Sequence, residues 1–230
     1  MVPGMARTWI PWAGGALALT AVVGALAPDA LAASKLLARG RVELPAYEVV
    51  DARPDFEVRR YEPRLVAEVE VEGDPDRASN AGFRVLAGFI FGGNTRAESV
   101  AMTAPVDRRP ASESIAMTAP VDRRKAGERW IIAFTMPSHY TRDTLPRPND
   151  RRVQIREVPA TTYAVRRFSG APGEVKVRGE MEALRAAVVA AGLTPAGAEP
   201  IYARYDPPWT LGPLRRNEVL LELAAPPAGR

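Results

Sequence analysis

Two stretches of this 230-residue chain have apolar residues at helical spacing, and each lies between segments that alternate apolar and polar residues. The first stretch predicts a helix over residues 75–91, and the second predicts a helix over residues 174–191. The alternation is clearest over residues 65–72, where leucine, alanine and valine face one way and three glutamates face the other. Period two over that length predicts a half-buried antiparallel strand with its glutamates on a solvated face.

The remaining alternating segments give both halves of the chain the same plan. Further strands are predicted near Tyr47 and over residues 56–59, 130–136, 153–155, 161–168, 201–205 and 219–223. Strands joined by short turns pair antiparallel, and amphipathic helices must cover the sheet with their apolar stripes. The predicted fold class is therefore α+β: a distorted antiparallel β-barrel or curved sheet flanked by two long helices, with an internal pseudo-repeat.

A near-exact duplication follows the first predicted helix. Residues 98–109 (ESVAMTAPVDRR) return as residues 113–124 (ESIAMTAPVDRR), with Ile115 in place of Val100. One repeat is too few for a solenoid, so we expect two short extended segments that pair as a hairpin. A proline in each segment favours a turn or a sheet edge there. The two Asp-Arg-Arg groups then predict a solvated basic surface or, alternatively, contacts with anionic lipid head groups or ligand carboxylates.

The first 32 residues differ in character from the rest of the chain. Residues 9–27 carry no charge, Arg7 precedes them, and Ala30-Leu31-Ala32 has the small-residue spacing of a cleavage site. This pattern predicts a secretory signal peptide. An uncleaved membrane anchor over residues 9–27 is the main alternative, and a buried or cytosolic segment is a third. The expected location is extracytoplasmic, either periplasmic or secreted, or else anchored to the membrane.

The rest of the chain divides into three predicted parts. Residues 33–45 are expected to be a linker, residues 46–224 a folded domain, and residues 225–230 a disordered tail. A domain of that length is large enough to bury a sizeable apolar core.

The residue inventory excludes several kinds of chemistry. The chain has no cysteine, and His139 is its only histidine. Disulfides, thiolate metal sites, iron–sulfur clusters, a cysteine nucleophile and zinc sites built from several histidines are thereby excluded. The formal net charge of +4 is a mild bias, so no nucleic-acid partner is expected. No G-x-S-x-G motif or phosphate-cradling glycine loop occurs, and the chain is predicted not to be an enzyme.

Several motifs, in order along the chain, resemble those of the SOUL haem-binding family. They are YEVV at 47–50 with FEVRRY at 56–61, NAGF at 80–83, the doubled AMTAPV, MPSHYT at 136–141, and RYDPPW at 204–209 with RRNEV at 215–219. The resemblance covers about residues 47–223. It implies a distorted antiparallel barrel flanked by two long helices, in agreement with the alternation pattern. It also implies non-enzymatic binding of haem or a related tetrapyrrole.

The resemblance further implies an apolar groove between the first helix and the C-terminal strands. The helix wall would be Phe83, Leu86, Ala87 and Ile90, although such a stripe beside a sheet is more often plain core. The opposite wall is expected among Tyr202, Trp209 and Leu214. Arg204, Arg215 and Arg216 are the expected partners of the two haem propionates, with a solvated or structural role as the alternative.

No strong axial iron ligand is expected. His139 is the best ligand by type and Tyr140 is adjacent, but their polar, proline-rich loop predicts an exposed histidine. Met102 and Met117 are iron ligands by type but are more typical of core filling. In some relatives the proposed axial histidine is nearer the N-terminus, where this chain has none.

Haem binding is therefore expected to be reversible and to rest on burial and propionate pairing, without an axial histidine of the usual type. Two alternatives stay open: a module for another planar amphipathic small molecule, and an interaction protein with no bound cofactor. Membrane contact is expected only through an uncleaved N-terminal segment.

Overall fold

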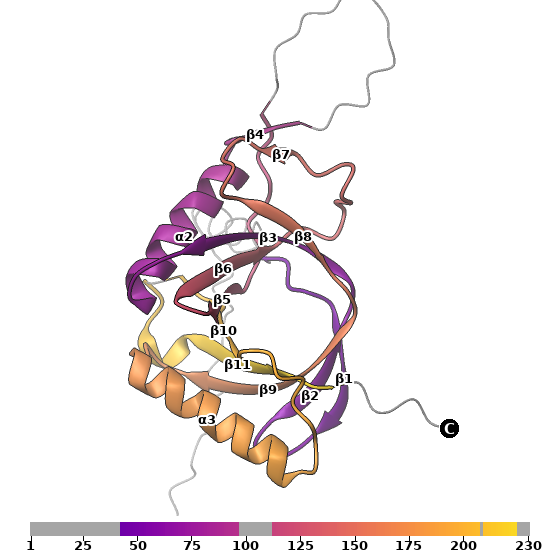
Figure 1. Cartoon of the computed structure of the whole chain (residues 1–230), viewed down its shortest axis with the longest axis vertical. Coiled ribbons are helices and arrows are strands. Elements are labelled where there is room, and N and C mark those ends of the chain that lie inside the picture. Colours follow the sequence, from indigo (N-terminus) through magenta and orange to yellow (C-terminus); the bar gives the residue numbers. More distant parts are fainter. Residues whose placement is uncertain (1–41, 97–111, 208, 225–230) are drawn as a thin grey trace, which may run out of the picture. The chain divides into compact units, whose positions relative to one another are not determined.

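The computed structural model describes residues 42–96, 112–207 and 209–224. Nine strands form one sheet in the order β1-β2-β9-β11-β10-β5-β6-β3-β8, and every neighbouring pair is antiparallel. The sheet curls into an open half-barrel with α2 (Pro75–Ile90) and α3 (Glu174–Ala190) along its outer side (Figure 1). The predicted α+β fold class, with a curved antiparallel sheet flanked by two long helices, is confirmed.

Eight of the nine strands of this sheet lie at the alternating segments of the sequence, and β5 lies at the end of the second copy of the duplicated segment. The nine strands are β1 (Tyr47–Ala52), β2 (Glu57–Tyr61), β3 (Arg64–Val71), β5 (Val121–Ala126), β6 (Arg129–Thr135), β8 (Gln154–Val158), β9 (Thr161–Ser169), β10 (Ile201–Arg204) and β11 (Arg216–Glu222). Two short strands, β4 (Asn94–Thr95) and β7 (Arg147–Pro148), pair with each other, and a 3-10 turn η1 (Gly212–Leu214) precedes β11.

The internal repeat is visible in the strand order. The series β2-β3-α2-β5-β6 and β8-β9-α3-β10-β11 follow the same plan along the chain. In the sheet, β5 pairs with β10 at the centre. Outward from β5 the strands are β6, β3 and β8, and outward from β10 their counterparts in the other series are β11, β9 and β2. The first strand of each series thus pairs with the second strand of the other series, which interlocks the two halves.

Local sequence signals set the bounds of α2. Asp74 caps its N-terminus by accepting a hydrogen bond from the Arg77 backbone N–H at 3.0 Å, and proline occupies the first position. Gly92, which has a φ of 109° that side chains rarely tolerate, follows its end. Gly82 lets the helix approach β6 closely, because a Cβ there would lie 2.4 Å from Ile132 Cγ1.

Each helix covers its own apolar cluster on the outer face of the sheet. Under α2 the buried members include Val69, Leu86, Phe89, Ile132 and Phe134. Under α3 they include Val58, Val177, Leu184, Val219 and Leu221. The inner face has only a small cluster, made of Tyr61, Tyr163, Val165, Ala203 and Leu220.

The inner face also carries buried ion pairs, and one of them corrects the prediction of a solvated glutamate face on β3. Glu70 and Glu72 are exposed as predicted, but the Glu68 side chain is only 13 % exposed. Its carboxylate pairs with Arg156 at 3.0 Å and with Arg124 at 3.4 Å. The cause is the curvature, since the second face of β3 lies inside the half-barrel, where other strands supply arginines.

The Asp-Arg-Arg group at 122–124 is likewise not the solvated basic surface that was predicted. Arg123 is 4 % exposed and pairs with Glu174 of α3 at 2.6 Å. Its guanidinium also lies 4.9 Å from the centre of the Trp130 ring and 5.2 Å from that of Tyr202. The reason is that β5 is a central strand, and the face that carries Arg123 lies against α3 and the Trp130 and Tyr202 rings.

The duplicated segment is described only in its second copy. The first copy, residues 98–109, and hence the predicted hairpin, lie outside the described residues. Ser114 and Thr118 form isolated bridges with Phe91 and Glu43, and regular strand begins only at Val121. The Glu43 bridge places part of the predicted linker against the folded domain.

In the described part of the chain, no helix is both long and apolar enough to span a bilayer. The predicted signal or anchor segment and the predicted disordered tail lie outside that part.

Candidate functional site

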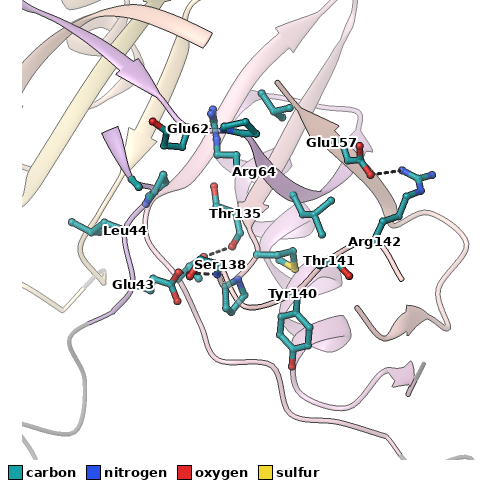
Figure 2. Close-up of a pocket in the computed structure, with 18 of the residues that line it drawn as sticks. Glu43, Leu44, Glu62, Arg64, Thr135, Ser138, Tyr140, Thr141, Arg142 and Glu157 are labelled. Carbon is teal, nitrogen blue, oxygen red and sulfur yellow. Dashed lines mark hydrogen bonds and ion pairs between the residues drawn. The ribbon is translucent and has the colours of Figure 1, made fainter. Parts of the chain in front are cut away.

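A pocket of about 920 Å³ lies at one end of the half-barrel, and we call it the barrel-end pocket. It is formed by the segment before β1, the turn between β2 and β3, the end of β6 with the loop after it, and the end of β8. Its lining residues are 43–46, 62–65, 118, 135–138, 140–142 and 157–159. Figure 2 shows Arg64 above Thr135, with Arg142 and Glu157 to one side and Glu43 and Leu44 to the other.

The walls of the barrel-end pocket are largely apolar. Met136 and Val158 are buried beneath it, and Leu65 is half-buried. Further apolar surface comes from Leu44, Pro45, Ala46, Pro63, Pro137 and Pro159. Ligand pockets in proteins are commonly of roughly 300–1,000 Å³ and mainly apolar, with a few polar groups that fix orientation. The barrel-end pocket has this character.

Two buried polar atoms in the pocket lining have no hydrogen-bond partner: Arg64 Nη1 and Thr135 Oγ1. The Thr118 hydroxyl beside them is already used, because it donates to the Thr135 carbonyl oxygen. Buried polar groups are nearly always paired in proteins, so each exception calls for an explanation. Both atoms therefore have hydrogen-bonding capacity that no group of the protein uses.

The exposed rim of the pocket is held by polar contacts between its segments. The Ser138 backbone N–H donates to Glu43 Oε1 at 2.8 Å, which ties the segment before β1 to the loop after β6. Arg142 and Glu157 form a loose ion pair of 4.0 Å. The Tyr140 hydroxyl donates to the Glu113 carboxylate, and burial together with that bond raises the pKa of Tyr140 to about 12. Tyr140 is therefore a neutral phenol near neutral pH.

A second charged cluster lies on the inner face of the sheet and centres on Glu218, which has no exposed surface. Its carboxylate accepts hydrogen bonds from Arg59, from Arg216 at 2.8 Å and from the Tyr205 hydroxyl at 2.6 Å. Burial, followed by the charge of Glu218, raises the pKa of Tyr205 far above its ordinary value. These groups satisfy one another, so the cluster is a structural element of the barrel.

The four helix residues predicted to line a haem groove divide into two pairs. Leu86 and Ile90 are 0 % and 1 % exposed and pack in the core between α2 and the sheet. Phe83 and Ala87 are half-buried, and the Phe83 ring packs edge-on against Phe134 at 5.5 Å between centres. Leu86 and Ile90 therefore offer no surface to a ligand in this structure. Their burial agrees with the alternative interpretation, in which the apolar stripe of the helix is part of the core.

The three residues predicted to form the opposite wall of the haem groove also do not lie together. Tyr202 is buried in the cluster under α3, where its hydroxyl donates to Asn217 Oδ1 at 2.8 Å. Trp209 and Leu214 are 82 % and 71 % exposed in the segment between β10 and β11. The structure does not bring Tyr202 into one surface with these two residues.

The three predicted propionate partners have different surroundings. Arg204 is half-buried on β10, and Arg215 Nε donates to the Thr210 carbonyl oxygen at 2.7 Å. Arg216 turns into the half-barrel, where it pairs with Glu218 and lies 3.9 Å from the centre of the Tyr205 ring. None of the ten residues predicted to bind cofactor lines the barrel-end pocket.

The described side chains that the sequence offered as iron ligands also do not meet at one site. His139 is exposed, with its ring 4.1 Å from that of Tyr140, and Met117 is 37 % exposed. Met102 lies outside the described residues. Within residues 42–96, 112–207 and 209–224, no three histidine or acidic side chains are grouped so as to hold a metal ion.

The pocket residues Arg64, Thr118 and Thr135 were not found by reasoning from the sequence. Alternation along β3 assigns Arg64 to the glutamate face, but the local sequence gives no sign that this face lines a pocket. That position depends on the pairing of β3 with β8 and of β2 with β9.

Residues 42–222 match the family model described as SOUL heme-binding protein, a range that contains all nine strands of the main sheet as well as α2 and α3. The chain belongs to the SOUL family. The family resemblance drawn from the sequence motifs is thus confirmed.

Among solved structures, this SOUL-family chain is similar to the EcmrR C-terminal domain, with 11% identity and a TM-score of 0.48, over 78% of this chain and 99% of that one. It is also similar to a hydrolase from Listeria innocua, with 10% identity and a TM-score of 0.49, over 76% of this chain and 94% of that one. A third similar structure is SAV2435 bound to tetraphenylphosphonium, with 10% identity and a TM-score of 0.43, over 74% of this chain and 94% of that one. A comparison with curated proteins finds no match.

Proposed function

We propose that this chain is a non-enzymatic binding protein that holds haem or a related tetrapyrrole in the barrel-end pocket. The observation that carries the proposal is the match of residues 42–222 to a family described by haem binding. The pocket supports it, because its volume of about 920 Å³ and its apolar walls suit a large, flat, mainly apolar ligand. Burial of such a ligand is favourable by about 25 cal/mol per Å² of apolar surface removed from water.

The residues present fit a tetrapyrrole body and its acidic side chains better than they fit iron. Met136 and Tyr140 are lining residues of types that ligate haem iron. Met136 is 4 % exposed, however, and the Tyr140 hydroxyl is engaged with Glu113. We therefore propose reversible binding that rests on burial and on pairing with arginine, as expected from the sequence.

Titration of the purified domain with haemin tests the proposal. The Soret band is expected to shift with saturable one-to-one stoichiometry. Ala46→Trp, which adds bulk at an exposed position of the lining, is expected to weaken binding while the protein stays folded. No saturable shift would contradict the proposal.

A matched variant separates the barrel-end pocket from the groove that the sequence suggested. Trp209→Ala removes the most exposed aromatic side chain of that predicted groove, at a position outside the pocket lining. Haemin affinity is expected to be unchanged in this variant. A loss in Trp209→Ala together with wild-type affinity in Ala46→Trp would favour the groove predicted from the sequence over the barrel-end pocket.

Export of the chain remains a proposal. It is supported by the uncharged run over residues 9–27 and the small-residue triplet that follows it. Mass spectrometry of protein from native soluble and membrane fractions would report the mature N-terminus and any retained ligand together. A retained non-haem ligand would favour the alternative of a binding module for another amphipathic molecule.

A further inference from the structure

The barrel-end pocket contains two buried polar atoms that have no hydrogen-bond partner in the protein, one on a charged side chain and one on a neutral side chain. Arg64 Nη1 is part of a cation, and Thr135 Oγ1 belongs to a residue that is 5 % exposed. Both residues line the pocket, and Figure 2 shows them next to each other, from the start of β3 and the end of β6. Two unpaired donors at one place in a pocket favour a ligand group that accepts hydrogen bonds.

The half-buried guanidinium of Arg64 also differs in its surroundings from the guanidinium groups of the buried Arg59 and Arg123. Arg59 and Arg123 each have a carboxylate within 3.0 Å. Among the described residues, Arg64 forms no ion pair within 4.0 Å, and its guanidinium instead lies 5.2 Å from the centre of the Tyr61 ring and 6.0 Å from that of the Tyr163 ring. An electrostatic partner is the Asp122 carboxyl, which makes no ion pair with Arg64, and burial raises the pKa of this carboxyl to about 7, so it offsets the charge only partly near neutral pH.

Three acidic residues line the same pocket, and all three are exposed at its rim: Glu43, Glu62 and Glu157. Glu43 accepts from the Ser138 N–H, and Glu157 pairs with Arg142. An acidic ligand group at the rim would be repelled by these glutamates, whereas at the inner end it would meet Arg64. The distribution of charge therefore favours a bound orientation in which the acidic group lies at the inner end, away from these glutamates.

We propose that the inner end of the barrel-end pocket is a carboxylate subsite in which Arg64 Nη1 and the Thr135 hydroxyl donate to one carboxylate of the ligand. The inference rests on the proposed function for the location of the ligand and adds its chemical class and orientation. The ligand is an amphipathic carboxylate whose acidic group lies inside and whose apolar body contacts Leu65, Met136 and Val158. A guanidinium and a carboxylate form charge-assisted hydrogen bonds, which are among the strongest in proteins.

Protoporphyrin IX and its dimethyl ester test the subsite without any contribution from iron. The affinity of each porphyrin for the wild-type protein and for the variants Arg64→Met, Thr135→Val and Arg142→Met is measured by porphyrin fluorescence. A hydrogen bond to a charged group corresponds to roughly 10- to 100-fold in affinity. We expect the diacid to bind about 10-fold or more tightly than the diester, and Arg64→Met to abolish that ratio.

The other two variants distinguish the subsite from a general effect of charge. Thr135→Val is nearly isosteric and is expected to weaken the diacid alone. Arg142→Met removes the other arginine of the pocket lining, at the exposed rim, and is expected to leave the ratio unchanged. Equal binding of diacid and diester to the wild-type protein would overturn the subsite while leaving tetrapyrrole binding intact.

Failure of the proposed function gives a different result, in which neither porphyrin binds. The subsite is then decided by 1-pyrenebutyrate and its methyl ester, a smaller planar pair with one acidic group. Preference for the acid that is lost in Arg64→Met would support the subsite, and absence of that preference would overturn it. Thermal unfolding of each variant confirms that the protein under test is folded, and Thr135→Val decides the matter if Arg64→Met does not fold.

Discussion

Arg59 on β2 donates to both carboxylate oxygens of Glu218 on β11, at 3.0 Å and 3.3 Å, although β9 lies between these two strands. The ion pair thus reaches across a strand on the inner face of the half-barrel. Both side chains are nearly inaccessible, with 5 % and 0 % exposed. A pair of this kind contributes little net stability when intact, but removal of one partner leaves a buried charge.

Glu218→Ala is expected to lower the free energy of unfolding by about 3–5 kcal/mol, because it removes the buried partner of Arg59 and the partner of Arg216 and leaves Arg59 only a partly exposed carboxylate. Glu57→Ala removes the other carboxylate that pairs with Arg59, at 2.7 Å, but that carboxylate is 43 % exposed. Its effect is expected to stay below about 1 kcal/mol. Urea unfolding measures the free energy of unfolding of both variants. Equal decreases in the two variants would contradict the prediction that the buried carboxylate of Glu218 matters more for stability than the exposed one of Glu57.

Asp122 is expected to make the stability of the domain fall as pH rises from about 4 to about 7. Burial raises its pKa from 3.8 to about 7 in the folded state, and its Oδ1 has no hydrogen-bond partner. Between about pH 4 and pH 7 the unfolded chain releases this proton and the folded chain retains it. The free energy of unfolding therefore decreases with each unit by which the pH rises. The slope from one such group approaches about 1.4 kcal/mol per pH unit.

Asp122→Asn isolates this contribution, because the amide has the shape of the acid and no titration. The stability difference between variant and wild type is expected to grow from pH 4 to pH 7 and to stay constant above pH 7. Urea unfolding at one-unit pH steps measures that difference. A difference that does not vary with pH would show that Asp122 titrates normally in the folded protein.

The elements of the fold were predictable because their signals are local. The helix predicted over residues 75–91 is observed as Pro75–Ile90, since its cap, its first-turn proline and the glycines after it are adjacent in sequence. The apolar face of β3 was predictable for the same reason. The opposite face was not, because Glu68 is covered by arginines from β5 and β8, which are far away in sequence.

The candidate site was less predictable than the fold. Leu86 and Ile90 have the spacing expected of a groove wall, but a helix that packs on a sheet has apolar residues at the same spacing. The structure places both residues in the core. Arg64 and Thr135 meet because β3 begins where β6 ends, in a register that no local pattern specifies. A single arginine in an alternating strand gives no sign of whether a carboxylate will lie opposite it.

Two glycines on α2 provide a direct test of the helix–sheet contact. Gly82→Ala would place a Cβ 2.4 Å from Ile132 Cγ1 and 2.7 Å from its Cβ, whereas a Cβ at Gly88 meets nothing within 4 Å. Overpacking at residue 82 is expected to cost about 1–3 kcal/mol of stability. Gly88→Ala is expected to raise stability by about 0.5–1 kcal/mol, since alanine favours helix. A shift of the same sign in both thermal unfolding midpoints would contradict close approach at residue 82.

Asn94 links the end of α2 to the second copy of the duplicated segment. Its side-chain amide donates to the Phe89 carbonyl oxygen at 2.7 Å and to the Glu113 carbonyl oxygen at 2.8 Å, and its side-chain oxygen accepts from the Glu113 N–H at 2.9 Å. The residue is 3 % exposed, so water cannot replace these partners. Asn94→Ala is therefore expected to lower the free energy of unfolding by about 1–3 kcal/mol.

Asn94→Asp distinguishes the donor role from simple space filling. A carboxylate would face two carbonyl oxygens without a proton to donate, so the variant is expected to be less stable than Asn94→Ala above the pKa of the new acid. Lowering the pH should recover part of the loss, because the protonated acid regains one donor. Urea unfolding at pH 4 and pH 7 compares the two variants. If Asn94→Asp were as stable as the wild type at pH 7, the hydrogen bonds to Phe89 and Glu113 would not hold this junction.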